Sequence, residues 1–208
     1  MQKLQVILCA FVLCFALSQT VRAQAAQEKQ EEVLSNTQGF FLQGHFQGHG
    51  LTVEEDDADS GRGFGIKAGY GFSPLFTLYL GIDGASMDVA DPGNRPVVGN
   101  EYTLAYVDLG GRFNFRAGPN SLVPYLDGSL TGIGSVYSTG AGEATFSGSA
   151  FSIGGGVQYF ISPQFAFNGG LHLSFGGYSE LDISGQTESV DLSVTGARID
   201  IGFSWYPF

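Results

Sequence analysis

The residues best suited to chemistry in this sequence are a histidine and a serine two positions apart, His172 and Ser174, followed by Glu180. Side chains two apart on a β-strand share a face, so the imidazole could act as a base toward the hydroxyl while the carboxylate orients the ring. A serine hydroxyl is a weak nucleophile until a neighbouring base takes its proton. The pattern therefore makes acyl transfer one function to weigh.

A second set of candidates consists of seven charged residues that alternate with apolar ones. Three are basic and four are acidic, so their charges nearly cancel. Burying a charge is costly unless an opposite charge lies close by, and a near-balanced set suits an enclosed interior. The alternative is that several of them lie near the ends of the structure, in water. The seven residues are Lys67, Asp83, Asp108, Arg112, Asp127, Arg198 and Asp200.

Two further groups resemble metal sites only weakly. His45 and His49 share one strand face, but no carboxylate or third histidine has an evident place beside them, so hydrogen bonding is the simpler expectation. The acidic run 54–59 could gather Ca²⁺ or Mg²⁺, but like charges in a solvated loop repel one another. We therefore expect no metal and no cofactor.

The elements that must position these residues are predicted by strict alternation of apolar and polar residues, which is typical of β-strands. Long polar connections follow the odd-numbered segments and tight turns follow the even-numbered ones. This asymmetry is typical of antiparallel hairpins that end in two different environments, and it predicts an up-and-down barrel. The eight segments are 39–47, 64–72, 76–83, 105–115, 123–131, 151–161, 165–175 and 199–205.

Composition indicates which barrel face is outside. Charged residues make up only 14% of the chain and Gly reaches 32 copies, so the polar face is too poor in charge for a solvated exterior. Aromatic residues also gather near the tight turns, as at a membrane interface. We therefore predict that the apolar face contacts lipid and that the polar face fills the interior. A soluble, lipocalin-like barrel with an apolar ligand cavity is the alternative.

The amino terminus has the features of an export signal. A short apolar run ends in small residues, so residues 1–23 are expected to be a signal peptide cleaved after Ala23 or Ala25. Residues 24–38 form a polar, flexible leader, and 39–208 form the barrel domain. Removing Lys3 and Arg22 takes the net charge from −11 to −13, which disfavours nucleic acid as a partner.

Four short stretches carry a family resemblance: Val-Asp-Leu-Gly-Gly-Arg-Phe at 107–113, Pro-Tyr-Leu at 124–126, Gly-Gly-Gly-Val-Gln-Tyr at 154–159 and the terminal Phe208. Over 39–208 the chain resembles the OmpA/OmpX-like outer-membrane β-barrel domain family. The resemblance implies an all-β fold, an eight-stranded antiparallel up-and-down transmembrane barrel in the outer membrane of a Gram-negative cell envelope. It also implies that Phe208 belongs to a carboxy-terminal signal read by the barrel assembly machinery.

The facing of Phe208 stays open, because strict alternation turns it inward whereas the family signal requires an outward aromatic residue. The pair His172 and Ser174 also resembles the His-x-Ser arrangement of lipid A deacylases. However, the stretches expected after that serine are missing, and the alternation points His172 inward.

We therefore expect a non-enzymatic, monomeric outer-membrane barrel with an envelope-structural or surface-contact role through four long acidic or polar loops. Outer-membrane lipids, lipopolysaccharide and the assembly machinery are its expected partners. A lipid-modifying enzyme and a soluble ligand-binding barrel are the alternatives.

Overall fold

The computed structural model describes residues 35–54, 57–90, 100–115, 120–139, 142–183 and 185–207. The expected signal peptide with Ala23, most of the expected leader, and Phe208 lie outside these residues. Within the described ranges, no helix combines the length and apolar character needed to cross a lipid bilayer.

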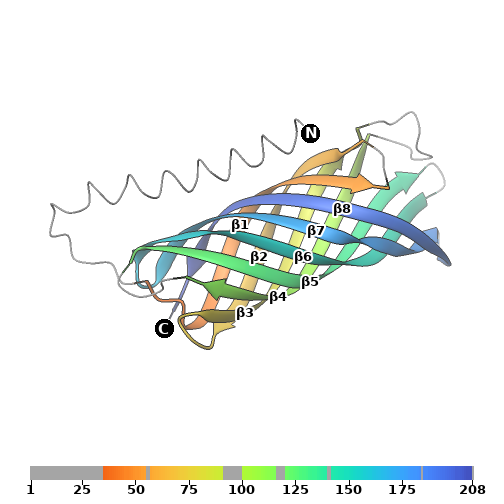
Figure 1. Ribbon diagram of the computed structural model, residues 1–208. Helices are drawn as coiled ribbons and strands as arrows, with labels where there is room; N and C mark the ends of the chain where they lie inside the picture. Colours follow the sequence, from red (N-terminus) through yellow and green to blue (C-terminus); the bar gives the residue numbers. More distant parts are fainter. Residues whose placement is uncertain are drawn as a thin grey trace, which may run out of the picture. The chain divides into compact units, whose positions relative to one another are not determined.

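Eight strands follow one another around a closed barrel, each antiparallel to its neighbours (Figure 1). The last strand pairs with the first, from Leu42 opposite Trp205 to Val53 opposite Val194, so the sheet has no free edge along this stretch. The predicted eight-stranded up-and-down fold is confirmed. The strands are β1 (Gly39–Val53), β2 (Asp59–Gly71), β3 (Phe76–Asp88), β4 (Glu101–Asn114), β5 (Leu122–Thr139), β6 (Gly142–Ser162), β7 (Phe165–Ile183) and β8 (Gln186–Trp205).

A belt of large apolar side chains covers the outside of the barrel. Leu109 is 61% exposed and Ile201 is 69% exposed, although both lie within regular strands. Lipid can cover such a surface and water cannot, so the soluble-barrel alternative is wrong. The belt occupies 40–46 in β1, 64–72 in and just after β2, 76–82 in β3, 107–115 in and just after β4, 122–130 in β5, 151–161 in β6, 165–175 in β7 and 199–205 in β8.

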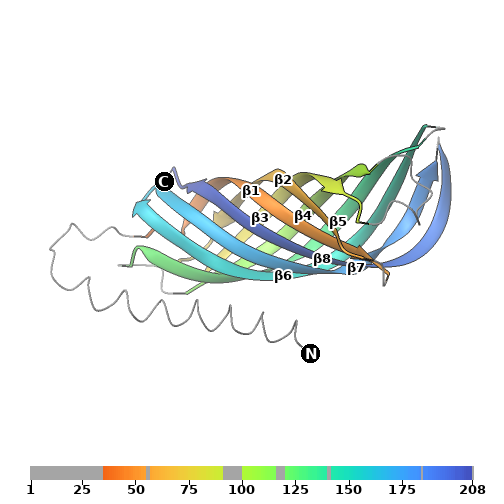
Figure 2. The same cartoon turned by 90° about the horizontal axis from the view of Figure 1, so that it is seen from above.

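Most strands are longer than the alternation predicted. The belt matches the predicted segments closely, but β6 begins at Gly142 rather than at 151, and β7 continues to Ile183 rather than to 175. The expected long loops after β1, β5 and β7 are therefore short connections at the tips of extended hairpins. Figures 1 and 2 show the β5–β6 and β7–β8 hairpins continuing at the end of the barrel opposite the carboxyl end of β8. The connection 89–100 after β3 remains long.

Beyond the belt, toward the extended hairpins, the outward side chains become small or polar and the inward ones become apolar. This change explains why the sequence pattern missed the extensions. In β8 the outward residues change from Ile199 to Ala197 and Thr195, whereas the inward ones change from Arg198 to Val194. Outside the lipid the outer face meets water and the inner face forms a small apolar core. The alternation persists, but small and polar residues weaken its contrast.

The barrel interior has three layers. Near the tight turns an apolar cluster closes the bottom of the barrel: Phe41, Tyr79, Val123, Phe160, Ala166 and Tyr206. A second apolar cluster fills the end that carries the extended hairpins: Leu51, Ala85, Met87, Val89, Tyr102, Leu104, Tyr106, Ile133, Tyr137, Tyr178 and Val194. Between the two clusters lies a layer of buried polar and charged side chains, which we call the polar layer. Its charged members and their main partners are His45, Lys67, Asp83, Asp108, Arg112, Asp127, Ser129, Thr131, Ser152, His172, Ser174, Arg198 and Asp200.

Candidate functional site

The polar layer contains all seven charged residues singled out in the sequence. Each is buried, with Arg112 1% exposed and Lys67 3% exposed. They reach the interior because each occupies an inward position of its strand, one residue away from an outward side chain of the belt. Lys67 lies on β2, Asp83 on β3, Asp108 and Arg112 on β4, Asp127 on β5, and Arg198 and Asp200 on β8.

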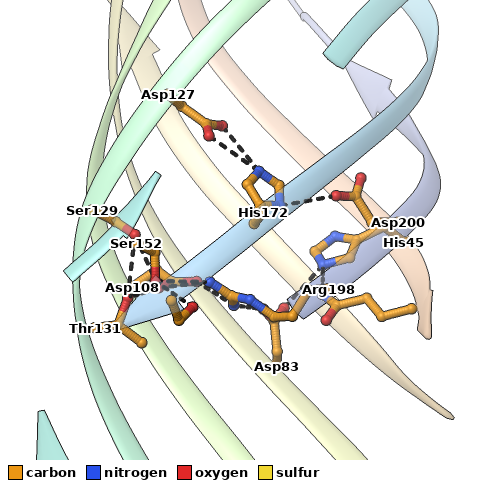
Figure 3. Close-up of polar contacts among 12 residues, drawn as sticks. His45, Asp83, Asp108, Asp127, Ser129, Thr131, Ser152, His172, Arg198 and Asp200 are labelled. Carbon is orange, nitrogen blue, oxygen red and sulfur yellow. Dashed lines mark hydrogen bonds and ion pairs between the residues drawn. The ribbon is translucent and has the colours of Figure 1, made fainter. Parts of the chain in front are cut away.

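Arg198 is the centre of one group of ion pairs (Figure 3). Its Nη1 donates to Asp83 Oδ2 and to Asp108 Oδ2, each at 2.8 Å, and its Nη2 donates to Asp108 Oδ1 at 3.3 Å. Asp83 also lies 2.9 Å from the Nε2 of His45 on β1. One guanidinium thus links two carboxylates from neighbouring strands, as burial of those carboxylates requires.

A chain of hydroxyl groups extends this group across the barrel. Thr131 and Ser129 both donate to Asp108 Oδ1, the latter at 3.1 Å. Thr131 lies 2.8 Å from Ser152, and Ser152 lies 2.7 Å from Ser174, between the hydroxyl oxygens in each case. Four neighbouring strands, β4 to β7, are therefore joined by side-chain hydrogen bonds within the polar layer.

A second group surrounds His172 on β7. Its Nε2 lies 3.1 Å from Asp127 Oδ1 and its Nδ1 lies 3.3 Å from Asp200 Oδ1, so the ring bridges two carboxylates (Figure 3). Arg112 Nη2 approaches Asp127 Oδ2 at 3.5 Å. Gly154 on β6 provides the space for this arrangement, because a Cβ there would collide with the imidazole and lie 2.8 Å from Asp127.

Tyrosine rings support the buried cations. The guanidinium of Arg112 lies 4.0 Å from the centre of the Tyr125 ring, and that of Arg198 lies 4.5 Å from the centre of Tyr106. The Nζ of Lys67 lies 5.4 Å from the centre of Tyr79. The negative face of an aromatic ring attracts a cation most strongly where water is excluded, so these rings stabilise the three buried cations.

The residues considered for acyl transfer do not form a catalytic set. Ser174 lies in the sealed interior and bonds to Ser152, and the structure gives no hydrogen bond between Ser174 and His172 among the described residues. His172 is instead held between Asp127 and Asp200. Glu180 is exposed on the extended part of β7 and is not bound to the imidazole. An acyl chain in the surrounding lipid has no path to this serine, because the closed sheet lies between them.

The histidines of β1 also have structural surroundings. His45 binds Asp83, and His49 stacks on Tyr106 with the ring centres 5.8 Å apart. No cluster of three or more histidine, cysteine or carboxylate side chains suitable for a metal ion occurs in the described ranges.

The two ends of the acidic run 54–59 are tied into the barrel. Glu54 accepts a hydrogen bond from the backbone of Ser193 at 2.7 Å. The buried Asp59 accepts one from Tyr102 Oη at 3.0 Å and one from the backbone of Ala90 at 2.9 Å. Residues 55 and 56 lie outside the described residues, so the structure describes only part of the cation site considered from the sequence.

The sequence interpretation did not include the neutral members of the polar layer. Ser129, Thr131 and Ser152 bind Asp108 or one another, and Tyr106 and Tyr125 cover the guanidinium groups. These residues share the inward register of the charged ones in their strands, and this register is the signal that would have found them.

Comparisons with solved structures show the same fold at low sequence identity. Neisserial surface protein A matches with a TM-score of 0.60 and 15% identity, covering 80% of this chain and 96% of the other. Ail, the attachment invasion locus protein of Yersinia pestis, matches with a TM-score of 0.52 and 14% identity, covering 81% and 99%. The outer membrane protein OprG of Pseudomonas aeruginosa matches with a TM-score of 0.50 and 13% identity, covering 83% and 98%.

No curated protein matches the chain significantly by sequence. The model of the outer membrane protein beta-barrel domain matches residues 7–206, which is nearly the whole chain and includes every strand. Together with the lipid-facing belt and the closed eight-stranded topology, this match shows that the chain belongs to the outer membrane protein beta-barrel domain family.

Proposed function

We propose that this outer-membrane barrel is a non-enzymatic envelope protein that presents a rigid contact surface outside the cell. The observation that carries the proposal is the four-stranded extension of β5 to β8 above the apolar belt. Its outward positions, such as Ser147 on β6 and Thr195 and Asp191 on β8, are exposed and polar. A hydrogen-bonded sheet of this kind, although its register shifts at Ser147/Gly148 and at Tyr178/Glu180, holds its side chains in fixed positions, which a mobile loop does not.

The extension is suited to contact rather than to transport. Its inner face is packed by the upper apolar cluster, in which Tyr102 stacks on Tyr137 with the ring centres 4.4 Å apart. Phe146 on β6 lies 5.6 Å from Tyr137 and 5.5 Å from Tyr178, again between ring centres. The hairpins are therefore braced from inside, and their outer faces and tips remain available to a partner.

Two of the structural relatives are consistent with such a role, although they share only the fold. One is called a surface protein and the other an attachment invasion locus protein. The acidic side chains of the extension, among them Glu143, Glu188 and Asp191, favour a partner surface that carries basic groups.

Export and assembly complete the proposal. Residues 1–23 act as the signal peptide and 24–38 as the leader, and the assembly machinery recognises the carboxy terminus with Phe208. The mature protein is a monomer embedded in outer-membrane lipid and lipopolysaccharide, since the closed sheet leaves no strand edge open within the belt.

Fractionation of the cell envelope tests location and role together. We expect the protein in outer-membrane fractions, extracted only by detergent, as a band whose gel mobility changes on heating, and a tag inserted at 140–141 should be accessible on intact cells. Recovery as a detergent-free periplasmic protein, or a tag accessible only after lysis, would refute the proposal. Lipid A should have the same mass with the wild-type protein and with Ser174→Ala, whereas a difference would favour the lipid-modifying enzyme.

A further inference from the structure

A shallow groove crosses the lipid-facing side of the barrel over β6, β7, β8 and β1, which are neighbours in the closed sheet (Figure 1). Its volume is about 560 Å³, which lies in the range of roughly 300–1,000 Å³ that small-molecule sites commonly have. The apolar side chains beside it belong to the belt. The groove is therefore continuous with the surface that lipid covers.

Two glycines form the floor of this groove. Gly169 on β7 lies between Val157 of β6 and Ile201 of β8 in the sheet register. A Cβ at Gly169 would have no heavy atom nearer than 3.9 Å, so the space outside this glycine is open. Ile201 is 69% exposed and Phe46 of β1 is 70% exposed, so both project beside that space. Gly48 of β1 continues the floor toward the extended hairpins. An alkyl chain lying here would contact glycine backbone below and apolar side chains on both sides.

An exposed arginine lies at the Gly48 end of the groove. Arg62 of β2 is directly opposite Gly48 in the β1–β2 pairing, and it lies one outward position beyond Phe64, where the belt of β2 ends. The other lysine and arginine side chains of the described ranges are buried in the polar layer. Hydrocarbon gives way to head groups at this border. An arginine there can rest its stem on apolar surface and offer its guanidinium to a phosphate.

The groove and Arg62 are spaced as the parts of one lipid molecule require. Neighbouring strands lie about 4.8 Å apart, so roughly 14 Å separates Val157 on β6 from Phe46 on β1, and β2 with Arg62 is the next strand. Because barrel strands are tilted, a row of opposite residues rises through the membrane. Val157 lies within the belt of β6, whereas Gly48 lies just beyond the belt of β1. An acyl chain in the groove thus leads from within the hydrocarbon to Arg62 at its border.

We propose that the groove and Arg62 form a binding site for one anionic membrane lipid. The phosphate of the lipid binds the guanidinium of Arg62, and one acyl chain lies over Gly48 and Gly169. Charge complementarity identifies the occupant: the chain has a net charge of −11, which repels anionic lipid elsewhere, but an exposed cation stands at the level of the head groups beside an apolar groove. The site rests on the lipid-facing belt and does not depend on the contact surface of the extended hairpins.

Native mass spectrometry of the barrel released from detergent micelles tests the head-group contact. The micelles contain either phosphatidylglycerol, which is anionic, or phosphatidylcholine, whose quaternary ammonium group neutralises the phosphate. At equal lipid concentration we expect the wild type to retain phosphatidylglycerol about fivefold more than phosphatidylcholine, the effect of one basic side chain at a membrane surface. Arg62→Ala should lose this preference, whereas Arg62→Lys should keep most of it because it keeps the charge. Both variants should fold, because lipid-free micelles offer Arg62 no phosphate.

Gly169→Leu tests the groove itself. The new side chain occupies the open space, so it should lower the retention of both lipids by roughly fourfold, the effect of one methylene group of the lipid losing its contacts. Gly128→Leu is the matched control, because Gly128 is an outward glycine in the belt of β5 and does not line the groove. It should retain both lipids as the wild type does. The heat-dependent gel shift shows whether each variant has folded.

A wild type that retains the two lipids equally overturns the proposal, as does a preference that persists in Arg62→Ala. Equal effects of the two leucine substitutions overturn the groove as the place of the acyl chain. If Gly169→Leu does not fold, Ile201→Ala removes one side of the groove instead. Its control is Leu130→Ala on β5, where Leu130 is 68% exposed and lies outside the groove, and only Ile201→Ala should lower the retention of both lipids.

Discussion

At the scale of single residues, Arg198 links parts of the chain that are distant in sequence. Its guanidinium binds Asp83, 115 positions away, and Asp108, 90 positions away. The arginine side chain is 4% exposed, so its charge depends almost entirely on these partners and on the Tyr106 ring. An aspartate left without this arginine would remain buried and charged, which is the costly case.

Replacing Arg198 should therefore destabilise the barrel strongly. We expect Arg198→Ala to lower the free energy of unfolding by roughly 3–5 kcal/mol, because it leaves buried carboxylates uncompensated. Urea unfolding in micelles measures this change. Arg62→Ala is the matched control, since Arg62 is exposed on the outer face of β2, and it should change the free energy of unfolding by about 0.5 kcal/mol at most. Equal effects of the two substitutions would contradict this interpretation of the polar layer.

At the scale of the strand, the exchange of faces marks the upper border of the lipid. On β7 the belt occupies 165–175, and Leu171 lies opposite Ile199 of β8. A strand needs about 9–11 residues to cross the hydrocarbon region, which agrees with the length of this belt. The residues of β8 before Ile199 carry small or polar outward side chains, so this part of the strand stands in water or among lipid head groups.

An arginine should lower the free energy of unfolding more in the middle of the belt than at its upper edge. Leu171→Arg places a charge near the middle of the belt and should lower the free energy of unfolding by about 2–4 kcal/mol. Thr195→Arg lies on the neighbouring strand at the upper edge of the belt, opposite Phe175, and should cost about 1 kcal/mol or less. Unfolding in phospholipid bilayers gives both values. A larger cost at Thr195 than at Leu171 would show that the membrane border is misplaced.

At the scale of the whole molecule, the interior is closed at both ends. Phe41, Phe160 and Tyr206 pack together near the tight turns. The rings of Phe41 and Tyr206 are stacked with their centres 5.7 Å apart, and those of Phe160 and Tyr206 are tilted with their centres 5.4 Å apart. The upper apolar cluster closes the other end. A polar layer between two apolar layers offers ions no continuous hydrated path, and an eight-stranded barrel is just wide enough to be filled by side chains.

The purified barrel should therefore form no steady open channel. In planar lipid bilayers we expect no stepwise conductance at neutral pH and moderate voltage, with an outer-membrane porin as the positive control for insertion. Folding and insertion are checked separately by the heat-dependent gel shift. Regular conductance steps from a fully folded sample would contradict the sealed interior.

The sequence by itself determined the number of strands, the order of the strands and which face of each strand contacts lipid. Segments such as 199–205 could be recognised because lipid requires large apolar side chains on every outward position, and this makes the alternation strong. It also predicted an inward register for the seven charged residues, but it left open whether several of them lie near the barrel ends in water. The burial of Lys67 and Arg112 agrees with that register.

Only the tertiary structure decided which groups meet and how far the strands extend. Ring closure and the stagger of neighbouring strands bring Arg198 to Asp83 and Asp108 and place His172 between Asp127 and Asp200, and no local pattern encodes such distant pairing. The extensions of β5 to β8 escaped detection because water outside and a small core inside reverse the faces and weaken the alternation. A sequence pattern reflects only whether each face of a strand meets lipid, water or the interior. Contacts across the barrel arise only when the sheet closes, so the sequence pattern does not contain them.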